Sequence, residues 1–165
     1  MTRKASGKQP ILVPVDFSVH SEAALLRACE LSERLKAPLL VLHVVHDPAE
    51  MPGYYSRVTK KKHLVRLEDA AAEMLDDFLK DIAGKNPKCK LLHKLDSKLV
   101  VGLPVTRILE VAEMVNATMI VMGSRGRTGL DRLMLGSKAE QVVRLSSIPV
   151  LIVKAEEELQ DDENR

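Results

Sequence analysis

One stretch in the C-terminal third of the chain constrains its fold more than any other. Met119-Ile120-Val121-Met122 is a short apolar run, typical of a buried strand in a parallel sheet. Gly123 ends the run, and further glycines follow at Gly126 and Gly136. Ser137-Lys138-Ala139-Glu140 then matches the Ser-x-x-Glu capping box, which predicts a helix start. The sequence therefore predicts a strand, a glycine-containing loop and a helix N-terminus in direct succession.

This succession suits a phosphate group. Glycines let backbone N–H groups approach an anion without a Cβ in the way, and a helix N-terminus offers unpaired N–H donors and the positive end of the helix dipole. The nearby basic side chains add positive charge: they are Arg125, Arg127, Arg132 and Lys138. The alternative is that the glycines only turn the chain and that Ser137 only caps a helix.

Two common phosphate-binding motifs are absent from this stretch. The Walker A loop requires Gly-x-x-x-x-Gly-Lys-Ser/Thr, whereas the chain reads Gly136-Ser137-Lys138 without the upstream glycine. The Gly-x-Gly-x-x-Gly fingerprint of dinucleotide-binding folds is also missing. A different glycine spacing must therefore carry any phosphate site.

The composition indicates a single domain with an aliphatic core. The chain has 165 residues, of which 45% are hydrophobic but only 2% aromatic, and it contains no Trp. The net charge is +2, and six carboxylates lie among the last eleven residues. A mildly basic body without clustered aromatic residues favours a small anionic ligand over nucleic acid. No apolar run has membrane length and the N-terminus lacks a signal-peptide core, so we expect a cytoplasmic protein without a membrane partner.

The two cysteines, Cys29 and Cys89, lie in different predicted elements. They form no CxxC motif and have no metal-ligand spacing, so no metal site is predicted. Reduced core thiols in a reducing compartment are favoured, and a disulfide is the alternative.

Apolar runs alternate with helical patterns along the chain. Strands are predicted at 11–17, 39–45, 90–101, 119–122 and 148–153. Helices are predicted from Ser18 or Ser21 to about Leu35, from His63 to Ala83 with Gly84 as C-cap, after Gly102-Leu103-Pro104, and from Ser137. The third strand is polar in its middle, which favours a sheet edge. Right-handed crossovers make this a Rossmann-like, doubly wound three-layer α/β sandwich, with a five-stranded parallel sheet and four helices.

The glycine spacing resembles the nucleotide-binding signature of the universal stress protein family. Gly123-x2-Gly126-x9-Gly136-Ser137 matches that signature at every spaced position. The resemblance covers about residues 10–154 and includes the segments Leu12–Ser18, Leu42–Val44, Val101–Pro104 and Pro149–Val153. It implies the strand order 3-2-1-4-5 and the ATP-binding branch of the family. We expect residues 1–9 to form a flexible tail, 10–154 a single nucleotide-binding domain and 155–165 an acidic C-terminal tail.

The resemblance also implies where ATP binds. In the family, the positions that match Pro14, Asp16 and Val44 surround the adenine and ribose. Met122 and the first signature glycine match positions by the ribose, and the other two glycines with Ser137 match positions at the phosphates. Mg²⁺ or Mn²⁺ would be held mainly by the phosphates. The candidate binding residues are Pro14, Val15, Asp16, Val44, Gly102, Met122, Gly123, Ser124, Arg125, Gly126, Arg127, Gly136, Ser137 and Lys138.

Several of these polar side chains allow a second interpretation. Asp16 follows the first strand at the edge where open α/β sheets bind ligands, and it could accept hydrogen bonds from ribose or adenine. The alternative is that it caps the first helix together with Ser18. His43 lies in an apolar strand and is expected to be a core histidine rather than a ligand. Ser124 and Thr128 could touch phosphate, although inert loop hydroxyls are favoured.

Three functions follow from these observations. The favoured one is an ATP-binding regulatory module of the stress response with a protein partner whose identity is open. The first alternative is a slow ATP hydrolase or self-phosphorylating enzyme. Hydrolysis needs a base or a metal-holding carboxylate near the γ-phosphate, and Asp131 is the only carboxylate that the sequence puts there. The second alternative, a nucleotide-independent dimeric scaffold, disagrees with the intact signature.

The last predicted strand indicates a homodimer. In the implied order it lies on an outer sheet edge, and its residues are uniformly apolar: Val150, Leu151, Ile152 and Val153. No inward charge or bulge protects this edge, so we expect it to pair with a second copy about a twofold axis. The alternative is a monomer in which Lys154 and the acidic tail shield the edge.

Overall fold

The computed structural model describes residues 9–46, 60–126 and 134–155, with backbone alone for 60–66. In these residues the strands are β1 (Ile11–Pro14), β2 (Leu39–Val45), β3 (Asp96–Val101), β4 (Met119–Gly123) and β5 (Val150–Val153). The helices are α1 (Val19–Leu35), α2 (Lys60–Lys85), α3 (Pro104–Met114) and α4 (Ser137–Leu145), with the short 3₁₀ helix η2 (Lys90–Lys94) after α2. Within the described ranges, no helix is both long and apolar enough to span a lipid bilayer.

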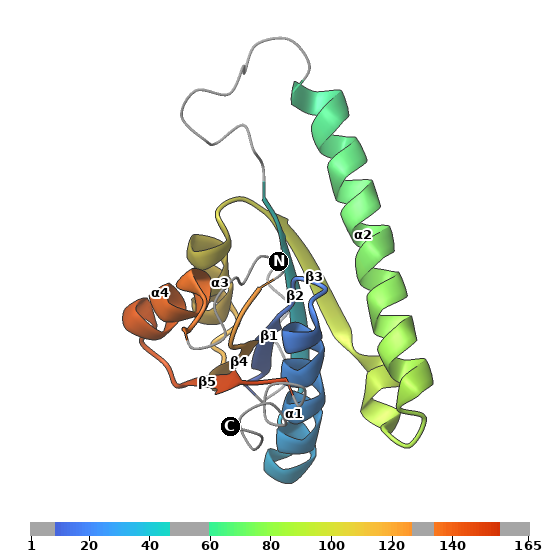
Figure 1. The fold of residues 1–165 in the computed structure, drawn as a ribbon, viewed down its shortest axis with the longest axis vertical. Helices are drawn as coiled ribbons and strands as arrows, with labels where there is room; N and C mark the ends of the chain where they lie inside the picture. Colours follow the sequence, from blue (N-terminus) through green and yellow to red (C-terminus); the bar gives the residue numbers. More distant parts are fainter. Residues whose placement is uncertain (1–8, 47–59, 127–133, 156–165) are drawn as a thin grey trace, which may run out of the picture.

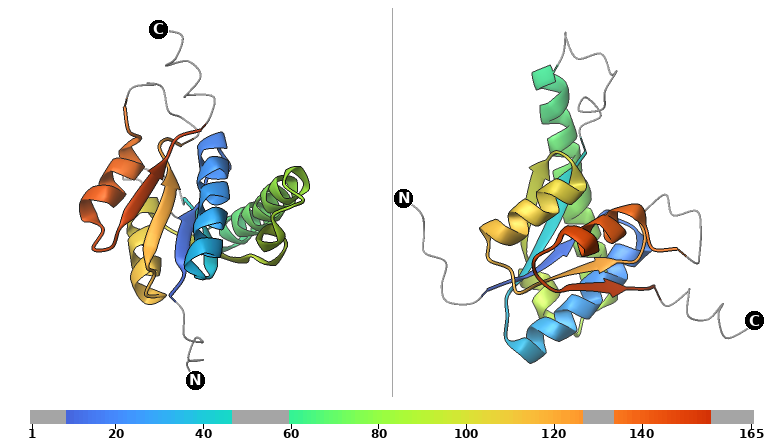
Figure 2. Two further views of the ribbon diagram at one scale, coloured as in Figure 1. Left: turned by 90° about the horizontal axis from the view of Figure 1, so that it is seen from below. Right: turned by 90° about the vertical axis from the view of Figure 1, so that its left-hand side faces the viewer.

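The five strands form one parallel sheet in the order β3-β2-β1-β4-β5, which confirms the predicted fold (Figure 1). β1 is the central strand and pairs from Ile11 with Leu39 of β2 and with Met119 of β4. Pro14 is the last residue of β1, as expected for a residue that lacks a backbone N–H. Two views at right angles show α1 and α2 on one face of the sheet and α3 and α4 on the other (Figure 2).

Side chains alternate between the two faces along β1 and so contribute to two separate cores. Ile11 and Val13 point to the first face, where the buried residues of the helices are Ala24, Leu25, Ala28, Cys29, Leu75, Ile82 and Ala83. Leu12 points to the second face, where α3 and α4 supply Ile108, Val111, Ala112, Ala139 and Val142. The buried residues of both clusters are non-aromatic, in agreement with the aliphatic core that the composition predicts.

The structure corrects the boundaries of several predicted elements. The predicted strand at 90–101 begins only at Asp96, because the preceding residues form η2 and bury Leu92 in the first core. α2 begins at Lys60 and continues to Lys85, so Gly84 is a helical residue rather than a C-cap. Leu35 is the last residue of α1 and is 55% exposed, so the buried face of the helix ends before it.

Gly123 governs how closely α1 lies on β4. A Cβ at Gly123 would lie 2.7–2.8 Å from the backbone carbonyl group and the Cβ of His20, in the first turn of α1. This separation is shorter than any ordinary van der Waals contact, so α1 can lie here only because residue 123 has no side chain.

We therefore predict opposite stability effects for two glycine-to-alanine substitutions. Gly123→Ala should lower the free energy of unfolding by about 1–3 kcal/mol, because the helix backbone must shift to admit the methyl group. Gly84→Ala meets no atom within 4 Å and should raise the free energy of unfolding by up to about 1 kcal/mol, because alanine is the better helix former. Urea denaturation measures both, and equal effects would contradict the packing argument.

Candidate functional site

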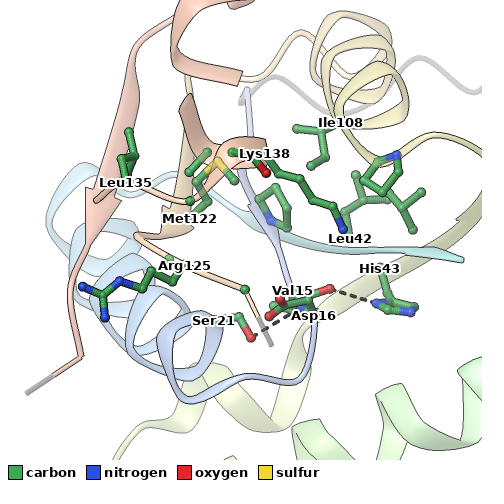
Figure 3. Close-up of a pocket in the computed structure, with 18 of the residues that line it drawn as sticks. Val15, Asp16, Ser21, Leu42, His43, Ile108, Met122, Arg125, Leu135 and Lys138 are labelled. Carbon is green, nitrogen blue, oxygen red and sulfur yellow. Dashed lines mark hydrogen bonds between the residues drawn. The ribbon is translucent and has the colours of Figure 1, made fainter. Parts of the chain in front are cut away.

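A cavity of about 570 Å³ opens where β1, β2 and β4 end (Figure 3). The connection after β1 leads to α1 on one face of the sheet, and the connection after β4 leads towards α4 on the other. The cavity therefore lies at the topological switch point, where open α/β sheets bind their ligands.

The lining is largely apolar and has its polar groups on opposite sides. The apolar lining residues are Pro14, Val15, Leu42, Val44, Pro104, Ile108, Met122, Met134, Leu135 and Ala139. Asp16 and Ser21 lie at the start of α1, whereas Ser137 and Lys138 lie at the start of α4. Such a lining suits a ligand with a flat apolar part and polar or anionic groups.

The Asp16 carboxylate is held by the N-terminus of α1. Its Oδ1 accepts hydrogen bonds from Ser18 Oγ–H at 2.5 Å and from Ser18 N–H at 3.2 Å. Ser18 is the N-cap of α1, and its Oγ accepts the Ser21 N–H at 3.2 Å. Asp16 thus orients the capping serine, which agrees with the helix-capping alternative, but it also lines the cavity. A side chain fixed in this way is pre-organised to accept a further hydrogen bond.

An aromatic stack stabilises the turn between β1 and α1. Phe17 has a φ of 65°, a left-handed conformation that is unusual for a bulky residue. Its ring stacks on His43 with a centroid separation of 4.3 Å and meets Phe78 of α2 edge-on at 5.5 Å. His43 Nδ1 also lies 2.8 Å from the carbonyl oxygen of Val15. His43 is therefore bonded to the backbone as predicted for a core histidine, but it lines the cavity as well, which the sequence did not predict.

The signature glycines lie close to other atoms of the protein. Gly123 admits α1, as described above. A Cβ at Gly126 would lie 2.7 Å from Asp16 Oδ2, and one at Gly136 would lie 3.2 Å from both Arg125 Cα and the Ser124 carbonyl oxygen. These contacts bring the two ends of the β4–α4 loop together and place the loop against Asp16. The glycines therefore serve contacts within the protein in addition to any role in admitting an anion.

The start of α4 corrects the predicted capping box. Gly136 is the N-cap, with φ −60° and ψ 141°, and Ser137 is already the first helical residue. No side chain caps the Gly136 position. Gly136 N–H instead donates to the Ser124 carbonyl oxygen at 2.8 Å, which closes the base of the loop. The first turn of α4 borders the cavity from Gly136 to Ala139.

The structure brings together most of the predicted site, with two exceptions. Gly102 is absent from the lining and lies in the turn between β3 and α3, where its φ is 140° and a Cβ would lie 2.6 Å from Arg107 Nε. Ser124 is also absent from the lining and is 5% exposed, and its Oγ has no hydrogen-bond partner in the structure described. The Arg125 side chain points away from the centre of the cavity in Figure 3, although the residue borders it.

Some predicted residues cannot be placed, and others were missed. Arg127, Thr128, Asp131 and Arg132 lie outside the described residues. The lining residues that sequence reasoning did not select are Ser21, Leu42, His43, Pro104, Ile108, Met134, Leu135 and Ala139. Leu42 and Ile108 fit ordinary strand and helix patterns, so only the tertiary arrangement assigns them to a cavity. The described residues contain no group of three His, Cys, Asp or Glu placed to hold a metal ion.

Comparison with known proteins assigns the chain to a family. The family model described as the Universal stress protein family matches residues 8–154. Universal stress protein YxiE of Bacillus subtilis is 32% identical over 148 residues, which cover 87% of this chain and 97% of that protein. Universal stress protein UspA from Lactobacillus plantarum has a TM-score of 0.73 and 25% identity, with 90% of this chain and 99% of the solved chain covered. A universal stress protein solved in complex with cAMP has a TM-score of 0.63 and 25% identity, with 91% and 99% covered. The chain belongs to the universal stress protein family.

Proposed function

We propose that this protein is an ATP-binding regulatory module and that the cavity between β1 and β4 is its nucleotide site. The observation that carries the proposal is the joint placement of Asp16, an apolar wall and the N-terminus of α4 around one cavity. The solved relative in complex with cAMP shares the fold and binds an adenine nucleotide, which supports the ligand class.

The apolar wall suits the adenine base. Leu42 and Val44 of β2, Ile108 of α3 and Met122 of β4 come from three different elements and line the same cavity. Burying a planar base against such side chains is favoured in proportion to the apolar area removed from water. The base would therefore lie on the β2 side of the cavity.

Asp16 suits the ribose. Its oxygens accept hydrogen bonds, and its fixed hydrogen bonds to Ser18 leave little side-chain entropy to be lost when a ligand binds. Ribose hydroxyl groups are donors of the required kind. Asp16 is thus assigned two roles, orientation of the α1 N-cap and recognition of the nucleoside.

The start of α4 suits the phosphates. Its first-turn N–H groups have no side-chain cap at Gly136, and an anion at this end is favoured by the helix dipole. Ser137 offers a hydroxyl donor, and the Lys138 ammonium extends into the cavity in Figure 3. A divalent cation such as Mg²⁺ would be held mainly by the phosphates, whose charge it would partly neutralise.

Binding is favoured over hydrolysis by the distribution of carboxylates. Among the described residues, Asp16 is the only acidic side chain that lines the cavity, and it lies at the end proposed for the nucleoside. Hydrolysis needs a group that orients water near the γ-phosphate. A regulatory module that senses ATP, with slow turnover if any, fits this arrangement.

We further propose that the protein acts as a homodimer paired through β5. β5 pairs only with β4 in the described sheet. Leu151 is 38% exposed, and Val150, Ile152 and Val153 are only partly buried. Pairing with the β5 strand of a second copy would satisfy the open edge and cover these side chains.

ATP should raise the melting temperature of the wild-type protein. Asp16→Ala should weaken ATP binding by roughly 1–3 kcal/mol, or about 5- to 150-fold, because the ribose hydroxyl donors would lose their acceptor. Isothermal titration calorimetry measures the affinity. The matched control is Ser18→Ala, which removes the α1 cap and should lower stability by about 1 kcal/mol. This variant keeps the Asp16 carboxylate and removes only its hydrogen bond from the Ser18 hydroxyl, so its loss of ATP affinity should be smaller than that of Asp16→Ala. An equal loss of ATP affinity in both variants would show that Asp16 acts only through the cap.

Lys138→Ala should weaken ATP binding by roughly tenfold but leave adenosine binding nearly unchanged, because the ammonium interacts with phosphate charge. Arg144→Ala is the matched control, since it removes one positive charge from the exposed last turn of the same helix. Titration with ATP, AMP, cAMP and adenosine would locate the phosphates. A Lys138 effect of the same size on adenosine would place the phosphates elsewhere.

Ile152→Lys should convert the proposed dimer into a monomer, because a charge would be buried in the paired edge. Analytical ultracentrifugation at micromolar concentration measures the assembly state. Met114→Lys introduces the same charge at a residue that is 70% exposed at the end of α3 and should leave the dimer intact. A wild-type monomer would contradict the proposal, and a dimer that survives Ile152→Lys would move the interface away from β5.

A further inference from the structure

The two cysteines meet on the face of the sheet that carries α1 and α2. Cys29 lies in α1, is 3% exposed and belongs to the first core cluster. Cys89 directly precedes η2, is half-buried and packs against the same cluster. The two cysteines are 60 positions apart in the chain, yet both pack in the same cluster.

The backbone around Cys89 holds its side chain in a defined place. The Cys89 N–H donates to the Asn86 carbonyl oxygen at 3.0 Å, and the Cys89 carbonyl oxygen accepts the Leu92 N–H at 3.2 Å. Asn86 Nδ2 in turn donates to the Ile82 carbonyl oxygen at 3.0 Å, which ties this connector to the end of α2. These bonds fix the turn that carries Cys89, which packs against the first core cluster.

The environments of the two sulfur atoms differ. Burial, together with the neighbouring Cys89 and its hydrogen bond, raises the pKa of the Cys29 thiol to about 12, and the nearby Glu33 and Glu30 act in the same direction. Cys29 is therefore a thiol at neutral pH, buried from any reagent in solution. Cys89 is the more accessible sulfur, and exposed Lys88 and Lys90 flank it in the sequence. Two adjacent positive charges attract an anionic reagent.

We propose that Cys29 and Cys89 form a reversible redox pair, in which an anionic small-molecule disulfide such as oxidised glutathione joins them in a disulfide bond between α1 and the α2–η2 connector. Cys29 is a buried member of the first core cluster and Cys89 packs against that cluster, so the disulfide would join two segments that already pack together. Neither cysteine lines the cavity, and this proposal is therefore independent of the proposed nucleotide function.

The reaction is an ordinary thiol–disulfide exchange in two steps. The Cys89 thiolate attacks one sulfur of oxidised glutathione, which forms a mixed disulfide at Cys89 and releases one glutathione thiolate. The Cys29 sulfur then attacks Cys89 Sγ, the bond to glutathione breaks, and the Cys29 proton passes to the departing glutathione thiolate. Two protein thiols are oxidised to one disulfide, and one glutathione disulfide is reduced to two thiols.

The test is to incubate the full-length reduced protein with oxidised glutathione and to map its disulfides by mass spectrometry without reduction. We expect a Cys29–Cys89 bond within one chain, the loss of both free thiols, and full reversal by dithiothreitol. The melting temperature should rise by roughly 5–15 °C on oxidation, because the bond closes a loop of about 60 residues in the unfolded chain.

Two alanine variants separate the steps. Cys29→Ala should retain one glutathione on Cys89, because the second thiol is missing, and should show no rise in melting temperature from an internal crosslink. Cys89→Ala should leave the buried Cys29 unmodified. The proposal is overturned if wild-type protein keeps glutathione on Cys89 without forming the internal bond, or if Cys89 links two chains instead. Because wild-type mapping requires no substitution, this decision does not depend on whether either variant folds.

Discussion

The close contact between α1 and β4 at Gly123 is the constraint on which the site depends. A Cβ at residue 123 would overlap the backbone of His20, so the first turn of α1 can reach the end of β4 only beside a glycine. That approach brings Asp16 and the N-cap Ser18 next to the loop that follows β4, where Gly126 leaves room for the Asp16 carboxylate. The absence of a Cβ at Gly123 thus helps to set the distance between the two sides of the cavity, the start of α1 and the loop after β4.

The same packing helps to explain the positions of the glycines in the family signature. Two of its glycines face protein atoms of α1 and Asp16, and the third faces the backbone of residues 124 and 125. Gly136 N–H also closes the loop on the Ser124 carbonyl oxygen. A glycine spacing that suits a phosphate group therefore also serves the assembly of the cavity walls, most clearly at Gly123, which meets the backbone of α1.

The fold could be predicted well from the sequence because strongly apolar segments are stable only where they pack against a core. The runs that became β1, β2 and β4 are largely buried, β5 packs partly buried at the sheet edge, and period-two alternation along β1 serves both cores. The prediction was wrong about the start of β3 and about the capping box, where local signals were overridden by the burial of Leu92 and by Gly136 taking the cap position. Sequence reasoning also missed His43 as a lining residue. His43 stacks on Phe17 and lines the cavity, and nothing in the pattern of an apolar strand indicates such a position.

α1 connects the two chemical sites proposed for this protein. Its N-terminus holds Asp16 through Ser18, and Cys29 lies ten residues after the first helical residue, about 15 Å along the axis. A nucleotide stabilises the folded state by mass action, whereas a disulfide acts largely through the unfolded chain. The two stabilisations should therefore add if α1 behaves as a rigid rod. A departure from additivity would mean that the crosslink moves the first turn of α1 against Gly123, since no other described element carries both a cavity residue and a cysteine.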